Sequence, residues 1–430
     1  MHIHLVSNSI YVNSGFGKVA RYIGMGLKKL GHEVSVTGLQ TIHRVDHDYG
    51  IDCYPLETGG HVDEATQLFL NLQNLKPDVL FFVGQMDADT NHLVKVFDKQ
   101  IIYCPVEGRN IPDQMTNDLK DVIRRGGKIV AQCSYGLEEM RKAGVNADRY
   151  IYHGIDPNVF YPISDDMIND NLELITDEVE IVSILKWDNA DKRWIQKNVD
   201  ILKLVDEIQG GINGRGKNNR FIYQFTGQNF GLRKQIPRLL KAYSLLINVS
   251  KQMKDRTVLA MHTLPISISG VNLIRNIHRL GIQDNVIFTY SSFGSSGWSE
   301  NAMNIWYNLA DVNVSASSSE GWGLPTGESM ACGIPNIGPN CSSFIELIGD
   351  DKDEFNKNRG WLANIATYHQ IQDGSERALV DEMDIALKLK IAYVEKDKMK
   401  MFSENGIEFM KNYTWDKICL QWNDLLKEMA

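Results

Sequence analysis

The sequence predicts an α/β protein built from two doubly wound domains, each with a parallel sheet covered by helices on both faces. A length of 430 residues exceeds the roughly 100–200 residues of one ordinary domain. Short apolar segments alternate with amphipathic stretches through both halves, as in strand–helix–strand units. The composition, with 43% apolar and 23% charged residues, is that of a globular protein and excludes collagen-like and low-complexity classes.

In the first half, an apolar strand at 2–7 leads into a helix at 18–30. Val19, Ile23 and Leu27 recur at helical spacing in that helix, and Gly31 ends it. Further strands are predicted at 33–37, 79–83, 101–106, 128–132 and 150–152. The turn-rich segment 153–157 follows the last of them, and we expect the first domain to span residues 1–155.

The second half repeats this rhythm, which predicts a second domain over residues 156–410. Its predicted strands are 221–226, 257–262, 286–290, 312–315, 335–337 and 361–363. Its predicted helices are 236–249, 270–280, 301–308, 327–332 and 380–394, and a last helix follows at 415–428. Residues 164–219 fit least well and are interpreted as an insertion, with a strand at 181–187 and a helix at 194–209.

The charge and the cysteines limit the classes of partner and compartment. With 45 Lys and Arg against 54 Asp and Glu, the net charge is −9, which argues against a nucleic-acid partner. None of the six cysteines forms a CxxC pair, so neither a zinc knuckle nor a redox dithiol is indicated. The chain shows no basic leader with an apolar stretch and no apolar run of membrane-spanning length. We therefore expect a cytoplasmic protein.

A glycine-rich loop follows the first strand, with Gly15 and Gly17 directly before Lys18. It matches the G-x-G-x-x-A pattern, but about seven residues separate it from the strand and strand 33–37 ends without an acidic residue. A nicotinamide-dinucleotide site is therefore excluded. The loop is either a turn before a helix or an anion site, because free N–H groups and the helix dipole favour a phosphate there.

The segment EGWGLPTGESMACGIP at 320–335 carries most of the chemistry. Glu320 and Glu328 are separated by seven residues, the first on a loop and the second expected in the first turn of a short helix. Three interspersed glycines allow a backbone to approach a ligand closely. Carboxylate oxygens accept hydrogen bonds from vicinal sugar hydroxyls. The alternative is a loop that merely starts a helix.

This segment resembles the signature of family 4, the retaining group 1 glycosyltransferases of the GT-B fold, which have two Rossmann-like domains facing a cleft. The resemblance covers most of residues 1–348 except 164–219, and it implies a last helix, 411–430, that crosses back to the first domain. The other matching segments are SGFGKVARY, HGIDPNVFYP, LRKQIPRLLKAY, NLADVNVSASSSEGWG and YTWDKICLQWNDLL.

The resemblance implies a role for each matching residue at the sugar. Glu320 would contact the transferred sugar near its reacting centre. The backbone N–H groups of Trp322, Gly323 and Leu324 would hold that sugar.

At the nucleotide, the resemblance implies that Glu328 binds the ribose hydroxyls. Arg233 and Lys234 would neutralise the diphosphate leaving group, as fixed cations do where charge develops. The alternative for this Arg-Lys pair is a solvated charge pair at a helix start.

The chain departs from the family pattern at two places. An Arg usually precedes the Lys by five or six residues, where this chain has Asn229 and Gln228. The cations weighed as substitutes are Arg21, Lys186 and Lys192. The first-domain histidine of the family is not evident.

In the corresponding segment, we select Glu107 as a residue that makes a polar contact to the sugar or the acceptor in the cleft. The alternative interpretation is that Glu107 is a solvated carboxylate on a loop. His153 is interpreted as hinge packing. Asp87-Ala88-Asp89 resembles a metal-binding D-x-D but is interpreted as a helix cap, so no metal site is expected.

The predicted function is retaining transfer of a hexose from a nucleoside-diphosphate sugar, UDP- or GDP-linked, to an acceptor hydroxyl, without a cofactor. The acceptor is a glycan, a lipid-linked sugar or a small molecule, and weak association with a membrane surface stays an open alternative. Two alternatives stay open: a non-catalytic nucleotide-sugar-binding protein, and a GT-B enzyme that uses phosphate or a small sugar as acceptor.

Overall fold

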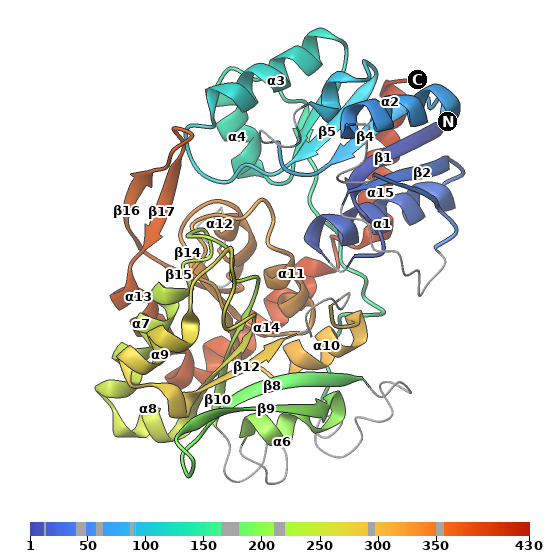
Figure 1. The fold of residues 1–430 in the computed structure, drawn as a ribbon. Helices are drawn as coiled ribbons and strands as arrows, with labels where there is room; N and C mark the ends of the chain where they lie inside the picture. Colours follow the sequence, from blue (N-terminus) through green and yellow to red (C-terminus); the bar gives the residue numbers. More distant parts are fainter. Residues whose placement is uncertain are drawn as a thin grey trace.

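The structure is a computed structural model, and it describes residues 1–12, 14–39, 49–56, 63–86, 90, 92–164, 180–209, 220–290, 297–349 and 357–430. Within these ranges the chain forms two large sheets, one from the first third of the sequence and one from the remainder. Figure 1 shows the two domains stacked one above the other, with a two-stranded hairpin reaching from the second domain toward the first.

The first sheet is wholly parallel and has the strand order β3-β2-β1-β4-β5-β6-β7 in the described residues. Its strands are β1 (His2–Asn8), β2 (Glu33–Leu39), β3 (Asp52–Pro55), β4 (Val79–Val83), β5 (Gln100–Cys104), β6 (Lys128–Ala131) and β7 (Arg149–Tyr150). The order reverses between β1 and β4, which marks the switch point where open α/β sheets bind ligands.

Helices cover both faces of this sheet, so its strands are buried on both sides and read as continuous apolar runs. They are α1 (Gly15–Lys29), α2 (Glu64–Leu75), α3 (Asp113–Arg124) and α4 (Ser134–Lys142), with a 3-10 turn η1 (Leu93–Lys95).

The second sheet has the order β15-β14-β13-β10-β11-β12-β8-β9. Its parallel part consists of β10 (Phe221–Thr226), β11 (Thr257–His262), β12 (Val286–Tyr290), β13 (Val312–Val314), β14 (Asn336–Pro339) and β15 (Gly360–Ala363). An antiparallel edge follows, made of β8 (Ile181–Asp188) and β9 (Arg193–Asp200). The order reverses between β10 and β13, so the loops after these two strands leave the same edge side by side.

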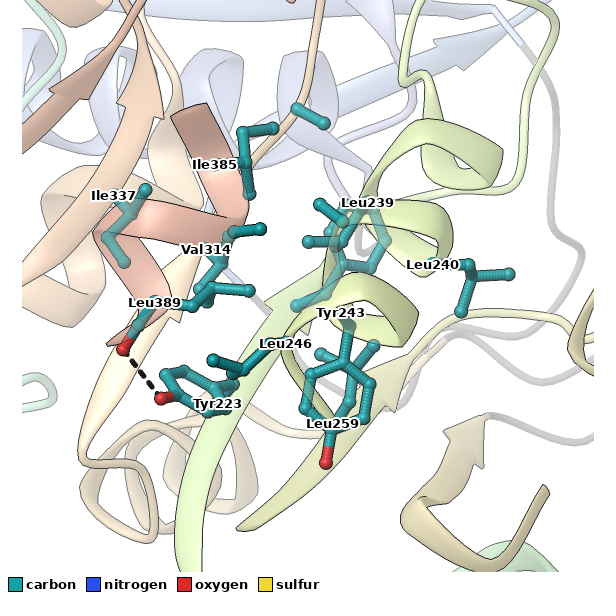
Figure 2. Close-up of a cluster of buried hydrophobic side chains, with 14 of the residues drawn as sticks. Tyr223, Leu239, Leu240, Tyr243, Leu246, Leu259, Val314, Ile337, Ile385 and Leu389 are labelled. Carbon is teal, nitrogen blue, oxygen red and sulfur yellow. Dashed lines mark hydrogen bonds between the residues drawn. The ribbon is translucent and has the colours of Figure 1, made fainter. Parts of the chain in front are cut away.

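The second domain has its own core, which lies between the sheet and the helices around it (Figure 2). Tyr223 on β10 is fully buried there, and its hydroxyl donates to the Leu389 carbonyl at 2.7 Å. The helices are α6 (Leu204–Gln209), α7 (Ile236–Asn248), α8 (Lys251–Arg256), α9 (Leu273–Leu280), α10 (Glu300–Asn308), α11 (Leu324–Ala331), α12 (Ser343–Ile348), α13 (Glu382–Val394) and α14 (Lys396–Met410). The 3-10 turns are η3 (Ile201–Lys203) and η4 (Gln283–Asn285).

The last helix, α15 (Trp415–Glu428), lies in the first domain beside α1 and β1 (Figure 1). Its buried face, which includes Ile418 and Trp422, belongs to the same core as the strands of the first sheet. The rings of Trp422 and Phe81 have centroids 4.7 Å apart. The end of the chain thus ties the two domains together.

One expectation for the elements needs correction. The helix predicted at 194–209 is wrong, because its first part is the strand β9, which pairs with β8 from Ile181↔Asp200 to Asp188↔Arg193. Only the apolar run after Asp200 becomes helical, where Ile201, Leu204 and Ile208 are buried. The backbone N–H and C=O groups of β9 form their hydrogen bonds with β8. The sequence pattern alone does not reveal this pairing.

The prediction also lacked the hairpin of β16 (Ile365–Gln370) and β17 (Glu376–Val380), whose strands pair antiparallel. In the part of the chain that the structure describes, no helix combines the length and the apolar character needed to cross a membrane.

Candidate functional site

Two loops of the second domain meet at the switch point of its sheet. The loop after β10 carries Arg233 and Lys234, and the loop after β13 carries Glu320. Lys234 Nζ lies 2.6 Å from Glu320 Oε1, and Arg233 Nη1 lies 2.9 Å from Glu320 Oε2. Each carboxylate oxygen of Glu320 therefore has its own cation.

The first domain adds a carboxylate to this group. Arg233 Nη1 lies 3.2 Å from Glu107 Oε1, and Arg377 Nη1 on β17 lies 3.6 Å from Glu107 Oε2. We call these five residues the Glu320 cluster: Glu107, Arg233, Lys234, Glu320 and Arg377. Three cations face two carboxylates in it, so the cluster has an excess of one positive charge.

Burial and charge act against each other on the acids and bases of the Glu320 cluster. Burial alone would raise the pKa of Glu320, but Lys234 and Arg233 outweigh it and lower that pKa to about 2. Burial likewise opposes a rise in the pKa of Arg233, yet Glu320 and Glu107 raise it. For Lys234, burial prevails and lowers the pKa. Glu320 is thus an anion at neutral pH.

The second glutamate of the motif, Glu328, lies in a different group of charges. It sits on α11, where Lys18 Nζ reaches its Oε1 at 2.7 Å and the Tyr307 hydroxyl donates to its Oε2 at 2.7 Å. Glu328 lies in the second turn of α11 and not in the first as predicted, because the helix already begins at Leu324.

Glu300 on α10 completes this second group. Lys18 Nζ and Arg21 Nη2 each lie 3.1 Å from Glu300 Oε1, and the Tyr22 hydroxyl donates to Glu300 Oε2. We call Lys18, Arg21, Glu300 and Glu328 the Glu328 cluster. Burial would lower the pKa of Lys18, but Glu328 and Glu300 outweigh it and raise that pKa. Both basic residues belong to α1 of the first domain and both acidic residues to the second, so the charges balance across the interface.

The first glycine loop lies directly against the motif. Gly15 begins α1 and is exposed, and a Cβ at this position would be 3.8 Å from Leu324 Cδ1. Gly17 is buried against the Ser9 and Val12 carbonyl oxygens, which leave no room for a side chain. Its N–H group donates to the N-cap Ser14, so Gly17 serves the turn, whereas Gly15 faces the second domain.

We expected the glycines of the motif to let the backbone approach a ligand, but two of them have other structural roles. A Cβ at Gly321 would lie 2.4 Å from Pro105 Cβ, so the backbone here approaches the first domain and not a ligand. Gly323 has a φ of +96° and is the N-cap of α11, a conformation that favours glycine.

The backbone of Trp322, Gly323 and Leu324 therefore stands at a helix N-terminus, where the first N–H groups have no intrahelical acceptor. The Trp322 side chain itself is buried and packs on Tyr152, with ring centroids 4.3 Å apart. A narrow pocket of about 10 Å³ lies beside these groups, lined by Lys234, Glu320 and Gly323 among others.

Arg377 is the residue that sequence reasoning missed. The cations weighed as substitutes lie elsewhere: Arg21 pairs with Glu300, and Lys186 pairs with Glu207. Lys192 lies between β8 and β9, near Asn189. Arg377 sits in a short strand far along the chain and belongs to no motif, so nothing in a single sequence could have placed it.

Asn229, at one position where the family usually has Arg, has a structural task. It is buried, its amide donates to the Leu264 and Val271 carbonyls, and its oxygen accepts from the Val271 N–H. These bonds tie the loop after β10 to the loop after β11.

His153 is buried between the domains, and its ring lies 5.5 Å from that of Tyr103. Burial lowers its pKa to about 3. Within the described ranges, no three His, Cys, Asp or Glu side chains gather as a metal site, and Asp87-Ala88-Asp89 lies outside those ranges.

Comparison with known proteins agrees with this geometry. Residues 213–408 match the family model of group 1 glycosyl transferases. The serotype-specific mannosyltransferase WbdA of Escherichia coli is 31% identical over 153 residues, which are 35% of this chain and 16% of that protein. The chain therefore corresponds to only a small part of that relative's length.

Solved structures resemble the whole chain. Sucrose-phosphate synthase from Thermosynechococcus elongatus superposes with a TM-score of 0.69 at 14% identity, over 100% of this chain and 99% of that chain. HepE from Anabaena, solved in complex with UDP and glucose, gives a TM-score of 0.66 at 13% identity over 100% of both chains. The chain thus has the GT-B fold along its length, and its residues 213–408 match the family model of group 1 glycosyl transferases.

Proposed function

We propose that this protein is a retaining glycosyltransferase that moves a hexose from a nucleoside-diphosphate sugar to an acceptor hydroxyl. The observation that carries the proposal is the Glu320 cluster, a largely buried group with one excess positive charge beside a helix N-terminus. The family match, the UDP and glucose bound to HepE and the mannosyl transfer in the name of WbdA support it.

We assign the chemistry as follows. The bond between the sugar and the phosphate breaks, and its electron pair goes to the departing phosphate oxygen. Lys234 and Arg233 stabilise the charge that builds there, as preorganised cations do. The same phosphate oxygen takes the proton of the incoming hydroxyl, which bonds to the sugar carbon on the face that the phosphate leaves. The products are the nucleoside diphosphate and a glycoside of unchanged anomeric configuration.

The other site residues bind the donor in this proposal. Glu320 contacts the sugar near its reacting carbon, with the backbone N–H groups of Trp322, Gly323 and Leu324 around it. Glu328 accepts hydrogen bonds from the ribose hydroxyls, and the exposed N–H of Gly15 faces a phosphate. No metal or cofactor is part of the mechanism.

Donor binding requires rearrangement of both clusters. Lys234 and Arg233 hold Glu320, and Lys18 holds Glu328. Since the pocket beside Glu320 has only about 10 Å³ of space, we infer that the domains separate to admit the donor and close again around it. Closure then excludes water, which competes as an acceptor.

The compartment in this proposal is the cytoplasm. All six cysteines are free thiols, which fits a reducing compartment.

The proposal is tested by thermal unfolding with UDP, GDP, ADP, CDP, dTDP and their sugars. A true ligand at 100 times its Kd adds about 2.7 kcal/mol of stability. We expect one nucleotide to stand out and to lose its effect in Glu328→Ala, but not in the control Glu404→Ala, whose carboxylate is exposed on α14.

Absence of a shift with every nucleotide would contradict the donor site. A shift without release of nucleoside diphosphate from the matching sugar would leave a binding protein and remove the transferase assignment. Wild-type turnover in Glu320→Ala would remove that residue from the mechanism.

A further inference from the structure

Glu346, on α12 of the second domain, binds the N-terminus of α4 in the first domain. Its Oε2 accepts from the Ser134 N–H at 3.0 Å and from the Ser134 hydroxyl at 2.7 Å. Its Oε1 accepts from the Tyr135 N–H at 3.1 Å. Figure 1 shows α12 in the second domain, below α4 of the first. Both oxygens of this carboxylate are thus used by the other domain.

The α4 helix depends on Glu346 for part of its N-terminal capping. The first N–H groups of a helix have no acceptor within it, and a carboxylate stabilises both these groups and the helix dipole. The N-cap residue of α4 is Cys133, whose sulfur accepts from the Gly136 N–H. Sulfur is a weak acceptor. The stronger acceptor therefore comes from α12, 212 positions from Ser134 along the chain.

Tyr152 of the first domain is a further donor to the same carboxylate. Its hydroxyl donates to Glu346 Oε2. Burial and the Glu346 carboxylate raise the pKa of Tyr152, so the hydroxyl keeps its proton at neutral pH. The donors belong to one domain and the acceptor to the other, so these bonds form only while the domains are docked.

The N-terminal end of α12 holds the main chain of Glu320. The Glu320 N–H donates to the Ser342 hydroxyl oxygen at 3.1 Å, and the Ser343 hydroxyl donates to the Glu320 carbonyl at 3.1 Å. The Cys341 thiol donates to the Ser318 carbonyl at 3.3 Å. Both main-chain polar groups of Glu320 are therefore bound by the start of α12.

Ser342 has a strained backbone at this contact. Its φ is +48° and its ψ is −145°, a region that residues other than glycine rarely adopt. Such residues persist where the surrounding contacts fix them, and they gather at functional sites. Glycine would lack the hydroxyl that accepts the Glu320 N–H, which gives a serine at this position a physical reason.

The α12 helix is a short packed body that can transmit a displacement from Glu346 to Glu320. Its buried residues Phe344 and Leu347 belong to a core of the second domain. The Arg359 guanidinium donates to the Glu346 carbonyl at 2.9 Å and so holds the C-terminal end of the helix together. Because packed side chains leave little free space, a shift of one end of such a helix moves the other end.

We infer that Glu346 is a positioning residue for the proposed glycosyl transfer. When the domains dock, its bonds to α4 fix α12, and the two serines at the start of α12 fix the main chain of Glu320. The inference rests on the proposed function for the role of Glu320, although the coupling itself can be measured without a donor. Glu320 then reaches its working position only in the docked state, so the open enzyme does not cleave its donor.

The first test is amide hydrogen exchange on the full chain without any donor. Glu346→Ala is compared with wild type and with Glu138→Ala, a control at an exposed position on α4. We expect about tenfold faster exchange in Glu346→Ala, both at residues 134–136 and at residues 318–322, and no change in the control. Faster exchange confined to residues 134–136, or no change at either segment, would overturn the coupling.

The second test separates positioning from domain docking alone. Release of nucleoside diphosphate is measured from the sugar nucleotide that stabilises the wild type most, with kcat and KM determined separately. We expect Glu346→Ala and Ser342→Ala each to lower kcat about tenfold and to change KM less than about threefold. The double variant should have the kcat of the single variants, because both substitutions act through one helix.

The conservative variant Glu346→Gln keeps an oxygen that can accept from Ser134 and should turn over faster than Glu346→Ala. Effects on kcat that multiply in the double variant would contradict a shared route through α12. A raised KM with an unchanged kcat would leave Glu346 as a residue that only holds the domains together. If no nucleotide stabilises the protein, the proposed function fails, and the exchange experiment still decides whether Glu346 fixes Glu320.

Discussion

The Glu320 cluster and the Glu328 cluster start from the same sixteen-residue segment, yet they differ in charge. In the Glu320 cluster, three cations face two carboxylates, and the excess charge is positive. In the Glu328 cluster, two cations face two carboxylates. Both clusters cross from one domain to the other and both are largely buried.

The difference indicates two separate tasks. A buried group with excess positive charge has unused capacity for an anion, which suits a departing diphosphate. A balanced group has no such excess and holds the domains together until a ligand takes over one of its members. We therefore expect losses in the Glu320 cluster to affect turnover first, and losses in the Glu328 cluster to affect stability first.

The largest effect is expected in the Glu320 cluster. Lys234→Ala should lower turnover by about 10³-fold, because the charge on the leaving phosphate loses one of the two cations proposed to stabilise it. The measurement is release of nucleoside diphosphate from the sugar nucleotide that stabilises the wild type most. Lys241→Ala, a half-exposed lysine on α7, should turn over normally. Comparable turnover in the two variants would remove the catalytic distinction between the clusters.

A smaller effect is expected in the Glu328 cluster. Lys18→Met leaves a buried carboxylate without its cation, which should cost on the order of 3 kcal/mol of stability in urea unfolding. Lys29→Met on the same helix breaks an ion pair whose partners are 71% and 73% exposed, and should cost less than about 1 kcal/mol. Equal losses of stability in the two variants would show that the Glu328 cluster does not hold the two domains together.

The smallest effect is expected at Arg377, the source of the excess charge. Arg377→Gln brings the Glu320 cluster to neutrality and leaves Glu107 to Arg233 alone, so nucleoside diphosphate should bind about tenfold more weakly. The Kd can be measured by calorimetry, with Arg193→Gln at an exposed turn as the control. An unchanged Kd would mean that the excess charge is not used by the donor.

Much of the fold was predictable, because buried strands and helices have characteristic patterns of apolar residues in the local sequence. The strands at 79–83, 221–226, 257–262 and 286–290 were predicted with their observed bounds, since a parallel strand buried on both faces is a continuous apolar run. The GT-B fold is confirmed, and residues 213–408 match the group 1 family model. Residues 194–200 were wrongly predicted as helix, because an edge strand exposes one side and its pattern resembles a polar helix.

The candidate site could be predicted only in part. Glu320, Arg233, Lys234 and Glu107 were selected from the sequence, and the structure brings them into one cluster. Their catalytic roles stay predictions. The sequence did not predict the partners of Glu328 or the place of Arg377 in the Glu320 cluster. Ion pairs between residues hundreds of positions apart produce no pattern in the local sequence.

The sequence by itself determined most of the buried parallel strands, several of the helices and the glutamate motif, because apolar periodicity and glycine positions are local properties of the chain. The tertiary structure alone decided which charges meet. The parallel pairing of β10 with β13 brought Lys234 to Glu320, and the docking of α1 on α10 and α11 brought Lys18 to Glu328. The hairpin carried Arg377 to Glu107. Each contact depends on packing between distant segments, and only the folded chain specifies that packing.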